Sequence, residues 1–195
     1  MPALDFDETL AAARAGEDWA WDLLYRWLAP SIFGFLRGRI PREAEDVASA
    51  VWTEAARNLG RFEGDEAGFR AWMFTIARRR MMNEYRRESR RAVELHGPDT
   101  LPVAHAVDDP EADVLAADAG SAAIELIRRV LPELQGEVVL LRVVAELPVA
   151  DIADMLDLAP GHVRVLAHRG LAALAEHFSQ VSVTLGVDPG ISEVP

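Results

Sequence analysis

The feature that most constrains this chain is the stretch from Phe69 to Arg91, where an apolar helical face runs into a cluster of arginines. Phe69, Trp72, Met73 and Ile76 recur at the spacing of one helix face, which predicts a helix that packs on a core. Seven arginines then stand against Glu84 and Glu88, a local charge of +5. The seven are Arg78, Arg79, Arg80, Arg86, Arg87, Arg90 and Arg91. Clustered guanidinium groups suit a phosphate backbone, although a solvated helix end with cations at its C-terminal dipole has the same pattern.

The charge of the rest of the chain makes this cluster an exception. The net charge is −12, lysine is absent, and residues 92–120 hold seven acidic residues and no arginine. Residues 1–91 are balanced, with 15 arginines and 15 acidic residues, and residues 121–178 have a net charge of −3. An acidic chain does not bind DNA indiscriminately. We therefore expect any contact with nucleic acid to come from local basic patches.

Composition narrows the class of protein. A length of 195 residues, half of them hydrophobic, suits one or two small domains. No apolar run approaches the roughly 18 residues of a membrane span, so we predict no membrane insertion. The start MPALDFDETL lacks the features of a signal peptide. Without cysteine there is no disulfide and no Cys-ligated zinc. We predict a cytoplasmic protein with no metal and no cofactor.

Helical periodicity on both sides of the acidic segment predicts an all-α fold of two small helical domains. The first domain covers residues 1–91 and the second residues 121–178. A flexible acidic linker, residues 92–120, joins them, because three prolines and few large apolar groups interrupt the pattern there. Residues 179–195, with two glycines and two prolines, are predicted to form a loose C-terminal tail.

Within the first domain, Pro30 is expected to end or kink a helix striped by Leu24 and Leu28, and a short second helix would then begin near Ile32. A helix starting near Pro41 follows, with Val47, Val51, Ala55 and Leu59 on one face. The segment 60–68, rich in glycine and acidic residues, is predicted to be a loop.

The second domain has the pattern of a helix-turn-helix. We expect one helix striped from Ile124 to Leu134, a buried helix over 138–147, and a short helix after Pro148. A turn with Gly161 then leads to a final helix. Its inward residues would be Val163, Ala167, Leu171 and Leu174. Its outward residues would be His162, Arg164, Val165, His168 and Arg169. Arginine suits guanine edges and phosphates alike, but a plain helical hairpin remains an alternative.

Four stretches together resemble the extracytoplasmic-function group of bacterial RNA polymerase sigma factors. They are DLLYRWLAPSIFGFLRGRI, EAEDVASAVWTEAARNL, FRAWMFTIARRRMMNEYRR and LPELQGEVVLLRVVAELPVADIADMLDLAPGHVRVLAHRGLAAL. The first three look like region 2 of that family and the fourth looks like region 4. The resemblance covers roughly residues 10–91 and 121–178. It implies a sigma factor that binds core RNA polymerase, directs promoter recognition and melting, and is held inactive by an anti-sigma protein.

The resemblance also implies roles for particular residues. Those that match the contact with the clamp of the largest polymerase subunit are Asp46, Val47, Ala50 and Trp52. Those that match the site for the minus-ten element of promoter DNA are Asn58, Arg61, Phe62, Arg78, Arg79, Arg80, Arg86 and Arg87. The five outward residues of the final helix would read the minus-thirty-five element. We expect Trp72 to anchor the core rather than stack on a base, and Phe62 to pack beneath the base site.

The chain departs from the family pattern at several positions. Arg79-Arg80 follows Ile-Ala-Arg where the family often has Asn, and Ser49-Ala50 stands where Gln-Glu is frequent. Arg164-Val165-Leu166 replaces the common Lys-Ser-Arg of the recognition helix, and Leu171 replaces a further arginine. The second domain is thus less basic than is usual in the family, which affects the promoter it would read.

Two other classes of protein are alternatives to a sigma factor for this sequence. A stand-alone helix-turn-helix regulator would bind duplex DNA without polymerase, commonly as a dimer on a palindrome. An all-α enzyme would need a catalytic signature, and none is present: His162 and His168 are six residues apart, which is not a metal-binding spacing. The regulator is therefore the stronger alternative to the sigma factor.

Overall fold

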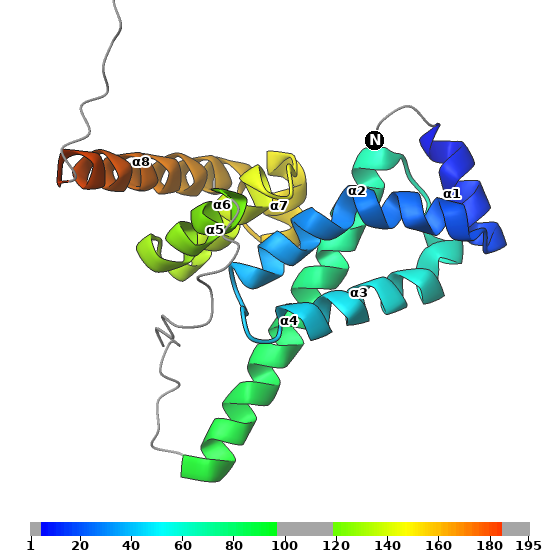
Figure 1. Cartoon of the computed structure of the whole chain (residues 1–195), viewed down its shortest axis with the longest axis horizontal. Helices are drawn as coiled ribbons and strands as arrows, with labels where there is room; N and C mark the ends of the chain where they lie inside the picture. The colour runs from blue at the N-terminus through cyan, green and yellow to red at the C-terminus, as the bar shows by residue number, and fades with distance from the viewer. Residues whose placement is uncertain (1–4, 97–118, 185–195) are drawn as a thin grey trace, which may run out of the picture.

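The computed structural model describes residues 5–96 and 119–184, and these residues form helices connected by short loops (Figure 1). The first group contains α1 (Phe6–Ala15), α2 (Asp18–Arg37), α3 (Ala44–Asn58), a 3₁₀ turn (Leu59–Arg61) and α4 (Glu66–His96). The second contains α5 (Ala119–Val130), α6 (Glu133–Val143), α7 (Val149–Leu156) and α8 (Pro160–Thr184). Since no strand occurs within these two ranges, the prediction of an all-α fold is confirmed.

The core of the first group lies where α2, α3 and α4 pack together. Leu28 and Phe35 of α2, Val51 of α3, and Phe69 and Phe74 of α4 are fully buried. Phe35 and Phe74 meet edge to face with their ring centroids 5.7 Å apart. The aromatic face that the sequence placed on α4 therefore forms the centre of this core.

Pro30 lies inside α2, so the prediction that it separates two helices was wrong. Pro30 is exposed, whereas Leu28 and Ile32 on either side of it are fully buried. A proline removes one backbone hydrogen bond from a helix. On the solvent side the carbonyl of Arg26 that loses this bond can accept one from water, while burial of the opposite face keeps the helix continuous.

In the second group, α8 crosses α6 at Gly170. A Cβ atom built at Gly170 would lie 2.5 Å from Val139 Cγ2, and it would also crowd Gln135 and Leu131. The glycine thus permits the close approach of α8 to α6, and Val138 to Leu141 are buried beneath it. This packing fixes the orientation of the helix-turn-helix formed by α7 and α8.

Several element boundaries differ from the sequence predictions. The stripe that starts at Ile124 does not extend to Leu134, because α5 ends before Pro132 and Leu134 is 40% exposed. The buried helix α6 runs over 133–143 rather than 138–147. Leu171, expected to face inward, is 48% exposed, because the neighbouring Gly170 makes the contact with α6.

The linker and tail predictions fall mostly outside the described residues. Helix α4 continues to His96, past residue 91, and α5 begins at Ala119. Helix α8 continues to Thr184, so the predicted loose tail does not start at residue 179. Among the described residues, none of the helices is both long and apolar enough to span a membrane.

Replacing Gly170 by Leu should destabilise the second group, because the new side chain would overlap Val139 in a closely packed crossing. We expect a loss of about 1–3 kcal/mol in the free energy of unfolding, the usual effect of overpacking. Chemical denaturation followed by circular dichroism would measure it. Gly161→Ala is the matched control, since a Cβ there meets nothing within 4 Å; equal stability of the two variants would contradict this account of the crossing.

Candidate nucleic-acid interface

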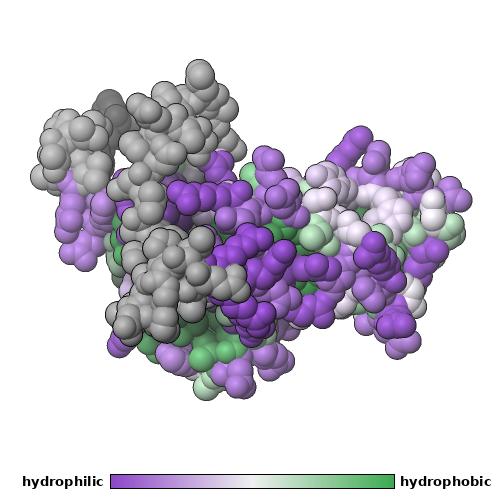
Figure 2. Space-filling model, turned by 90° about the horizontal axis from the view of Figure 1, so that it is seen from below, coloured by the Kyte–Doolittle hydropathy of each residue, from purple (hydrophilic) through white to green (hydrophobic). Residues whose placement is uncertain are grey.

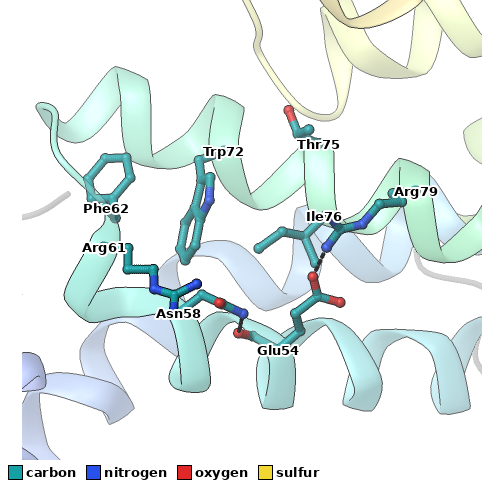
Figure 3. Close-up of a pocket in the computed structure, with 8 residues that line it drawn as sticks. All are labelled: Glu54, Asn58, Arg61, Phe62, Trp72, Thr75, Ile76 and Arg79. Atoms are coloured by element: carbon teal, nitrogen blue, oxygen red, sulfur yellow. Dashed lines mark hydrogen bonds and ion pairs between the residues drawn. The ribbon is translucent and has the colours of Figure 1, made fainter.

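A pocket lies between the end of α3, the 3₁₀ turn and the first turns of α4 (Figure 3). The residues that line it are Glu54, Asn58, Arg61, Phe62, Trp72, Thr75, Ile76 and Arg79. In the close-up, Phe62 and Trp72 stand toward one end and Glu54 and Arg79 toward the other. The pocket therefore offers aromatic surface and charged groups to the same ligand.

The aromatic end is built on the core. The Phe62 ring centroid lies 5.2 Å from that of Trp72, with the ring planes inclined by 35°. Phe62 also meets the buried Phe69 edge to face at 5.3 Å. Phe62 is 7% exposed, as expected for a residue that packs beneath the site. Trp72 is partly exposed and lines the pocket as well as packing on the core.

Glu54 organises the charged end. Arg80 Nε lies 2.6 Å from Glu54 Oε2, and Arg79 forms an ion pair with the other carboxylate oxygen. The Glu54 side chain is only 12% exposed, whereas Arg79 is 60% exposed. One shielded carboxylate thus binds both Arg79, which lines the pocket, and Arg80, which follows it in the sequence. Removing one partner of a partly buried ion pair is destabilising, because it leaves the other charge without a partner. Sequence reasoning did not assign Glu54 to the site.

Arg14 of α1 is a second residue that sequence reasoning missed. Its guanidinium donates hydrogen bonds to the carbonyl oxygens of Leu59, at 3.4 Å, and of Phe62. These carbonyls belong to the turn that forms the floor of the pocket. No sequence signal could have identified Arg14, because it lies 45 residues before Leu59 and only the fold brings the two together.

The remaining arginines of α4 have different environments. Arg86 and Arg87 are exposed, at 3.3 Å from Asn83 and 3.2 Å from Glu84 respectively. Arg90 and Arg91 are also exposed. Figure 2 shows the molecule from below, and strongly hydrophilic side chains gather in the middle of that face. Arg78 instead points away from the pocket and binds Glu137 of α6, with Nε 2.9 Å from Oε1.

The outer face of α3 carries most of the residues matched to the polymerase contact. Asp46 is exposed and Ala50 and Trp52 are partly exposed. Trp52 pairs with Tyr25 of α2 at a centroid distance of 5.0 Å, and Tyr25 is 54% exposed. The expectation for Val47 needs correction, because it is 7% exposed and faces the core. At helical spacing, Val47 shares its face with Val51 and not with Asp46.

The helix-turn-helix presents the predicted residues to solvent. His162, Arg164, Val165, His168 and Arg169 on α8 are all exposed, while Val163 is fully buried. Asp157 ends α7 in a left-handed conformation with φ of 54°, which allows the tight turn into α8. The exposed residues occupy the N-terminal half of α8, the part that enters the major groove in proteins of this architecture.

Among the described residues, no group of metal ligands and no ionisable group with a shifted pKa lies at the pocket. No group of three or more His, Asp or Glu within the described ranges is placed to hold a metal ion. Burial raises the pKa of the Tyr85 hydroxyl, which donates to the carbonyl of Arg39 at 2.8 Å. Burial also raises the pKa of Glu43, and the nearby Glu88 contributes. Neither group lines the pocket, so neither suggests an acid or a base acting on a ligand there.

Comparison with known families agrees with this geometry. The model for Sigma-70 region 2 matches residues 24–91, which span α2 to α4 and contain the pocket. The model for Sigma-70 region 4 matches residues 122–174, which contain the helix-turn-helix.

Individual relatives give the same result. The chain is 30% identical over 181 residues to the ECF RNA polymerase sigma factor BldN of Streptomyces coelicolor, covering 89% of this chain and 68% of that protein. It is 28% identical over 177 residues to SigD of Mycobacterium tuberculosis, covering 87% and 82%. The solved structure of CnrH in complex with the cytosolic domain of CnrY shares the fold, with a TM-score of 0.56 at 21% identity, over 90% of this chain and 97% of that one.

The chain therefore belongs to the extracytoplasmic-function sigma factors of the sigma-70 family. As a member it is an alternative sigma factor, which binds core RNA polymerase and directs promoter recognition and transcription initiation. The resemblance inferred from the sequence is confirmed. Because this family consists of initiation factors that act with polymerase, the alternative of a stand-alone helix-turn-helix regulator is not supported.

Replacing Arg14 by Met should loosen the floor of the pocket without unfolding the domain. The variant keeps the apolar part of the side chain but loses the hydrogen bonds to the carbonyls of Leu59 and Phe62. We expect faster amide hydrogen exchange over residues 59–65 and a loss of at most about 1 kcal/mol in overall stability. Arg57→Met, at an exposed position near the end of α3, is the control. Unchanged exchange over 59–65 would show that Arg14 does not support the turn.

Proposed function

We propose that the pocket between α3 and α4 holds an unstacked base of the minus-ten element during promoter melting. The observation that carries this proposal is the junction of aromatic and cationic groups in one pocket. Phe62 and Trp72 supply aromatic surface, and Arg61 and Arg79 supply donors at the same opening. Stacking on aromatic rings and cationic contact with the backbone are the two means by which proteins bind single strands.

The exposed arginines along α4 extend this site. Arg80 lies beside the pocket, and Arg86 and Arg87 follow toward the end of the helix. A displaced strand that leaves the pocket would run along these guanidinium groups. Asn58 lies at the pocket as well, where its Nδ2 donates to the Glu54 carbonyl at 2.8 Å. Arg78 would join the set only when it is released from Glu137.

The other assignments follow the same division of labour. The exposed residues of α8, His162, Arg164, Val165, His168 and Arg169, would read the minus-thirty-five element in the major groove. Asp46, Ala50 and Trp52 on the outer face of α3 would contact the clamp of the largest polymerase subunit, with Val47 supporting them from the core. In this proposal the protein acts by binding and positioning its partners, without a catalytic residue, metal or cofactor. It does so in the cytoplasm, where polymerase acts.

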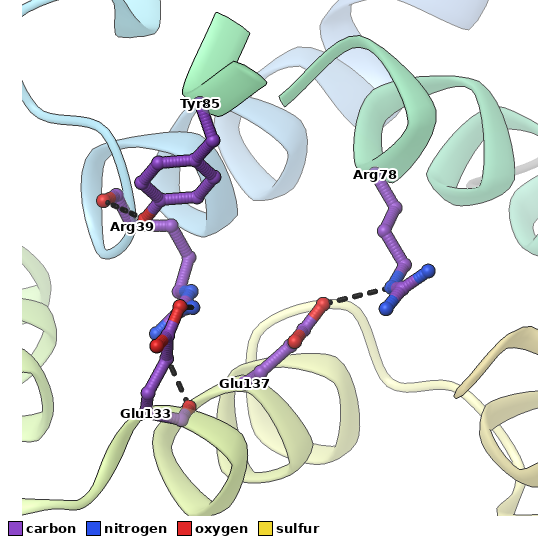
Figure 4. A network of polar contacts seen from close by, with 5 residues as sticks. All are labelled: Arg39, Arg78, Tyr85, Glu133 and Glu137. Atoms are coloured by element: carbon purple, nitrogen blue, oxygen red, sulfur yellow. Dashed lines mark hydrogen bonds and ion pairs between the residues drawn. The ribbon is translucent and has the colours of Figure 1, made fainter. Parts of the chain in front are cut away.

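We also propose that an anti-sigma protein holds this chain inactive. The solved structure with the same fold, CnrH, is described in complex with the cytosolic domain of CnrY. The two matched regions are separate segments of the sequence, residues 24–91 and 122–174. A protein that binds between them would have to replace the contacts that join them in this structure, such as the Arg78–Glu137 ion pair (Figure 4). We also propose that the first domain ends at residue 91 and that the second begins at residue 121.

The test of the proposal is transcription initiation by purified core RNA polymerase on a pool of genomic promoter fragments. Defined start sites that depend on this chain are the expected result. The sharpest variant replaces Arg79 and Arg80 by Ala together with Glu54 by Gln, so that no unpaired carboxylate is left buried. Its matched control is Glu54→Gln alone, which keeps both arginines.

We expect the triple variant to lose most initiation, at least about tenfold, while it binds core polymerase as the control does. Initiation is measured from run-off transcripts and core binding from comigration on a sizing column. Parallel loss of core binding and initiation would contradict the assignment of Arg79 and Arg80 to the minus-ten element. Tight duplex binding with no initiation by the unaltered chain would overturn the proposed division of labour.

Replacing Arg164 by Ala should weaken binding of the holoenzyme to duplex promoter DNA. If Arg164 contacts a phosphate, the slope of the logarithm of affinity against the logarithm of salt concentration should fall by about one. Fluorescence anisotropy between low and moderate salt would measure the slope. Arg142→Ala in α6, outside the helix-turn-helix, is the comparison variant. A slope equal to that of the unaltered protein would exclude a phosphate contact at Arg164.

A further inference from the structure

Two polar side chains of the pocket between α3 and α4 have already donated a proton within the protein. Asn58 Nδ2 donates to the backbone carbonyl of Glu54 at 2.8 Å. Because a carbonyl oxygen can only accept, the amide nitrogen must face it, and Asn58 Oδ1 points the other way as an acceptor. Thr75 Oγ1 donates its one proton to the Ala71 carbonyl at 2.9 Å, so toward a ligand it can only accept. Asn58 and Thr75 therefore offer acceptors to the pocket.

Arg79 supplies donors at another point of the pocket. Its Nη2 forms an ion pair with Glu54 Oε1, while Glu54 Oε2 binds Arg80. Among the residues that the structure describes, Glu54 is the only partner of Arg79, and the Arg79 side chain is 60% exposed. A guanidinium group has five N–H donors in one plane. The carboxylate thus holds one side of this plane, and the remaining donors are open to a ligand.

The donors and the acceptor are about one helical turn apart. Asn58 and Glu54 are four residues apart on α3, which separates them by about 6 Å along the helix axis. Because Arg79 is bound to Glu54, its guanidinium stands at the Glu54 end of this interval. In Figure 3 the Trp72 ring hangs from α4 toward Asn58. A flat ligand that lies against this ring would meet an acceptor at one end and a cationic donor at the other.

Guanine is the base whose edges match this arrangement. Its O6 and N7 are adjacent acceptors, which an arginine binds with two parallel hydrogen bonds. Its N1–H and N2–H₂ groups are donors on the neighbouring edge, and they suit an acceptor such as Asn58 Oδ1. The two edges lie along the length of a purine, as the separated groups of the pocket require.

The other three bases match less well. Adenine presents its N6 amino group beside N7, so a donor would face the donors of Arg79. Thymine carries a methyl group in place of a second donor. Cytosine has its acceptors and its amino group on one edge of a single ring, so it cannot meet groups that stand a helical turn apart. Only guanine satisfies both ends of the pocket.

We propose that Arg79 makes this pocket selective for guanine. Arg79 donates to O6 and N7 of an unstacked guanine of the minus-ten element, and Asn58 Oδ1 accepts from the neighbouring edge of the same base. Arg79 is one of the positions at which this chain departs from the family pattern, so the preference is a property of this chain. The choice of guanine rests on the proposed function, in which the pocket holds an unstacked base.

The test uses the holoenzyme formed by the full chain and core polymerase, on a promoter taken from the mapped start sites. Each position of the minus-ten element carries each of the four bases in turn on the non-template strand, and run-off transcripts measure initiation. We expect one position at which guanine supports initiation about tenfold better than any other base, the discrimination usual for a bidentate arginine contact.

Two matched variants identify the residue that makes this choice. Lysine keeps the positive charge of arginine but lacks the planar fork that binds O6 and N7 together. Arg79→Lys should therefore reduce the preference for guanine to about twofold or less. Arg80 binds the same carboxylate but does not line the pocket. Arg80→Lys should lower initiation alike with all four bases and leave the preference for guanine unchanged.

A guanine analogue identifies the atoms. 7-Deazaguanine replaces N7 by C–H and so removes one of the two acceptors that Arg79 would bind. The unaltered holoenzyme should lose most of its preference when this analogue occupies the selected position. The Arg79→Lys holoenzyme should be indifferent to the analogue, because two changes to one contact are not additive. Equal losses in both holoenzymes would overturn the assignment of N7 to Arg79. So would a preference for another base, or a guanine preference that survives Arg79→Lys.

Thr75→Phe separates this choice of base from the function of the pocket. Thr75 is an exposed residue of α4 that lines the pocket, and Phe has a helix propensity close to that of Thr. The new ring should fill the pocket, abolish most initiation and leave core binding intact. Normal initiation by Thr75→Phe would overturn the proposed function together with the choice of guanine. Loss of initiation by Thr75→Phe without any Arg79-dependent preference would overturn only the choice of guanine.

Discussion

Burial of the apolar face of α4 against α2 and α3 is the interaction on which the rest of the structure depends. Phe69, Met73 and Phe74 are fully buried there, and their burial supplies the main driving force for the domain. Because this face is fixed, the opposite side of the same helix is fixed as well. The wall of the pocket and the row of arginines are therefore held by a rigid core rather than by a loop.

The arginines of α4 acquire distinct roles from their partners. Glu54 keeps Arg79 and Arg80 at the pocket, and Glu137 draws Arg78 toward region 4. In each pair the charged groups lose part of their hydration and gain a charge-assisted hydrogen bond or ion pair. Three of the seven arginines of the basic cluster are held in this way, whereas Arg86, Arg87, Arg90 and Arg91 are exposed.

The contact between the two matched regions joins helices that lie far apart in the sequence. Gly34 and Gly38 of α2 let α5 and α6 approach closely, because a Cβ at either position would crowd Ile124, Leu140 or Val144.

The sequence by itself determined the helices, their buried faces and the family, because amphipathic periodicity and the basic stretch after Ile76 are local features of the chain. It also identified Val163 as buried and Arg164 as exposed on the recognition helix. Only the tertiary structure decided that Pro30 is accommodated within α2 and that Arg14 and Glu54 support the pocket. The partners of these residues come from distant segments, and packing free energy, which no local pattern records, outweighs the local preferences.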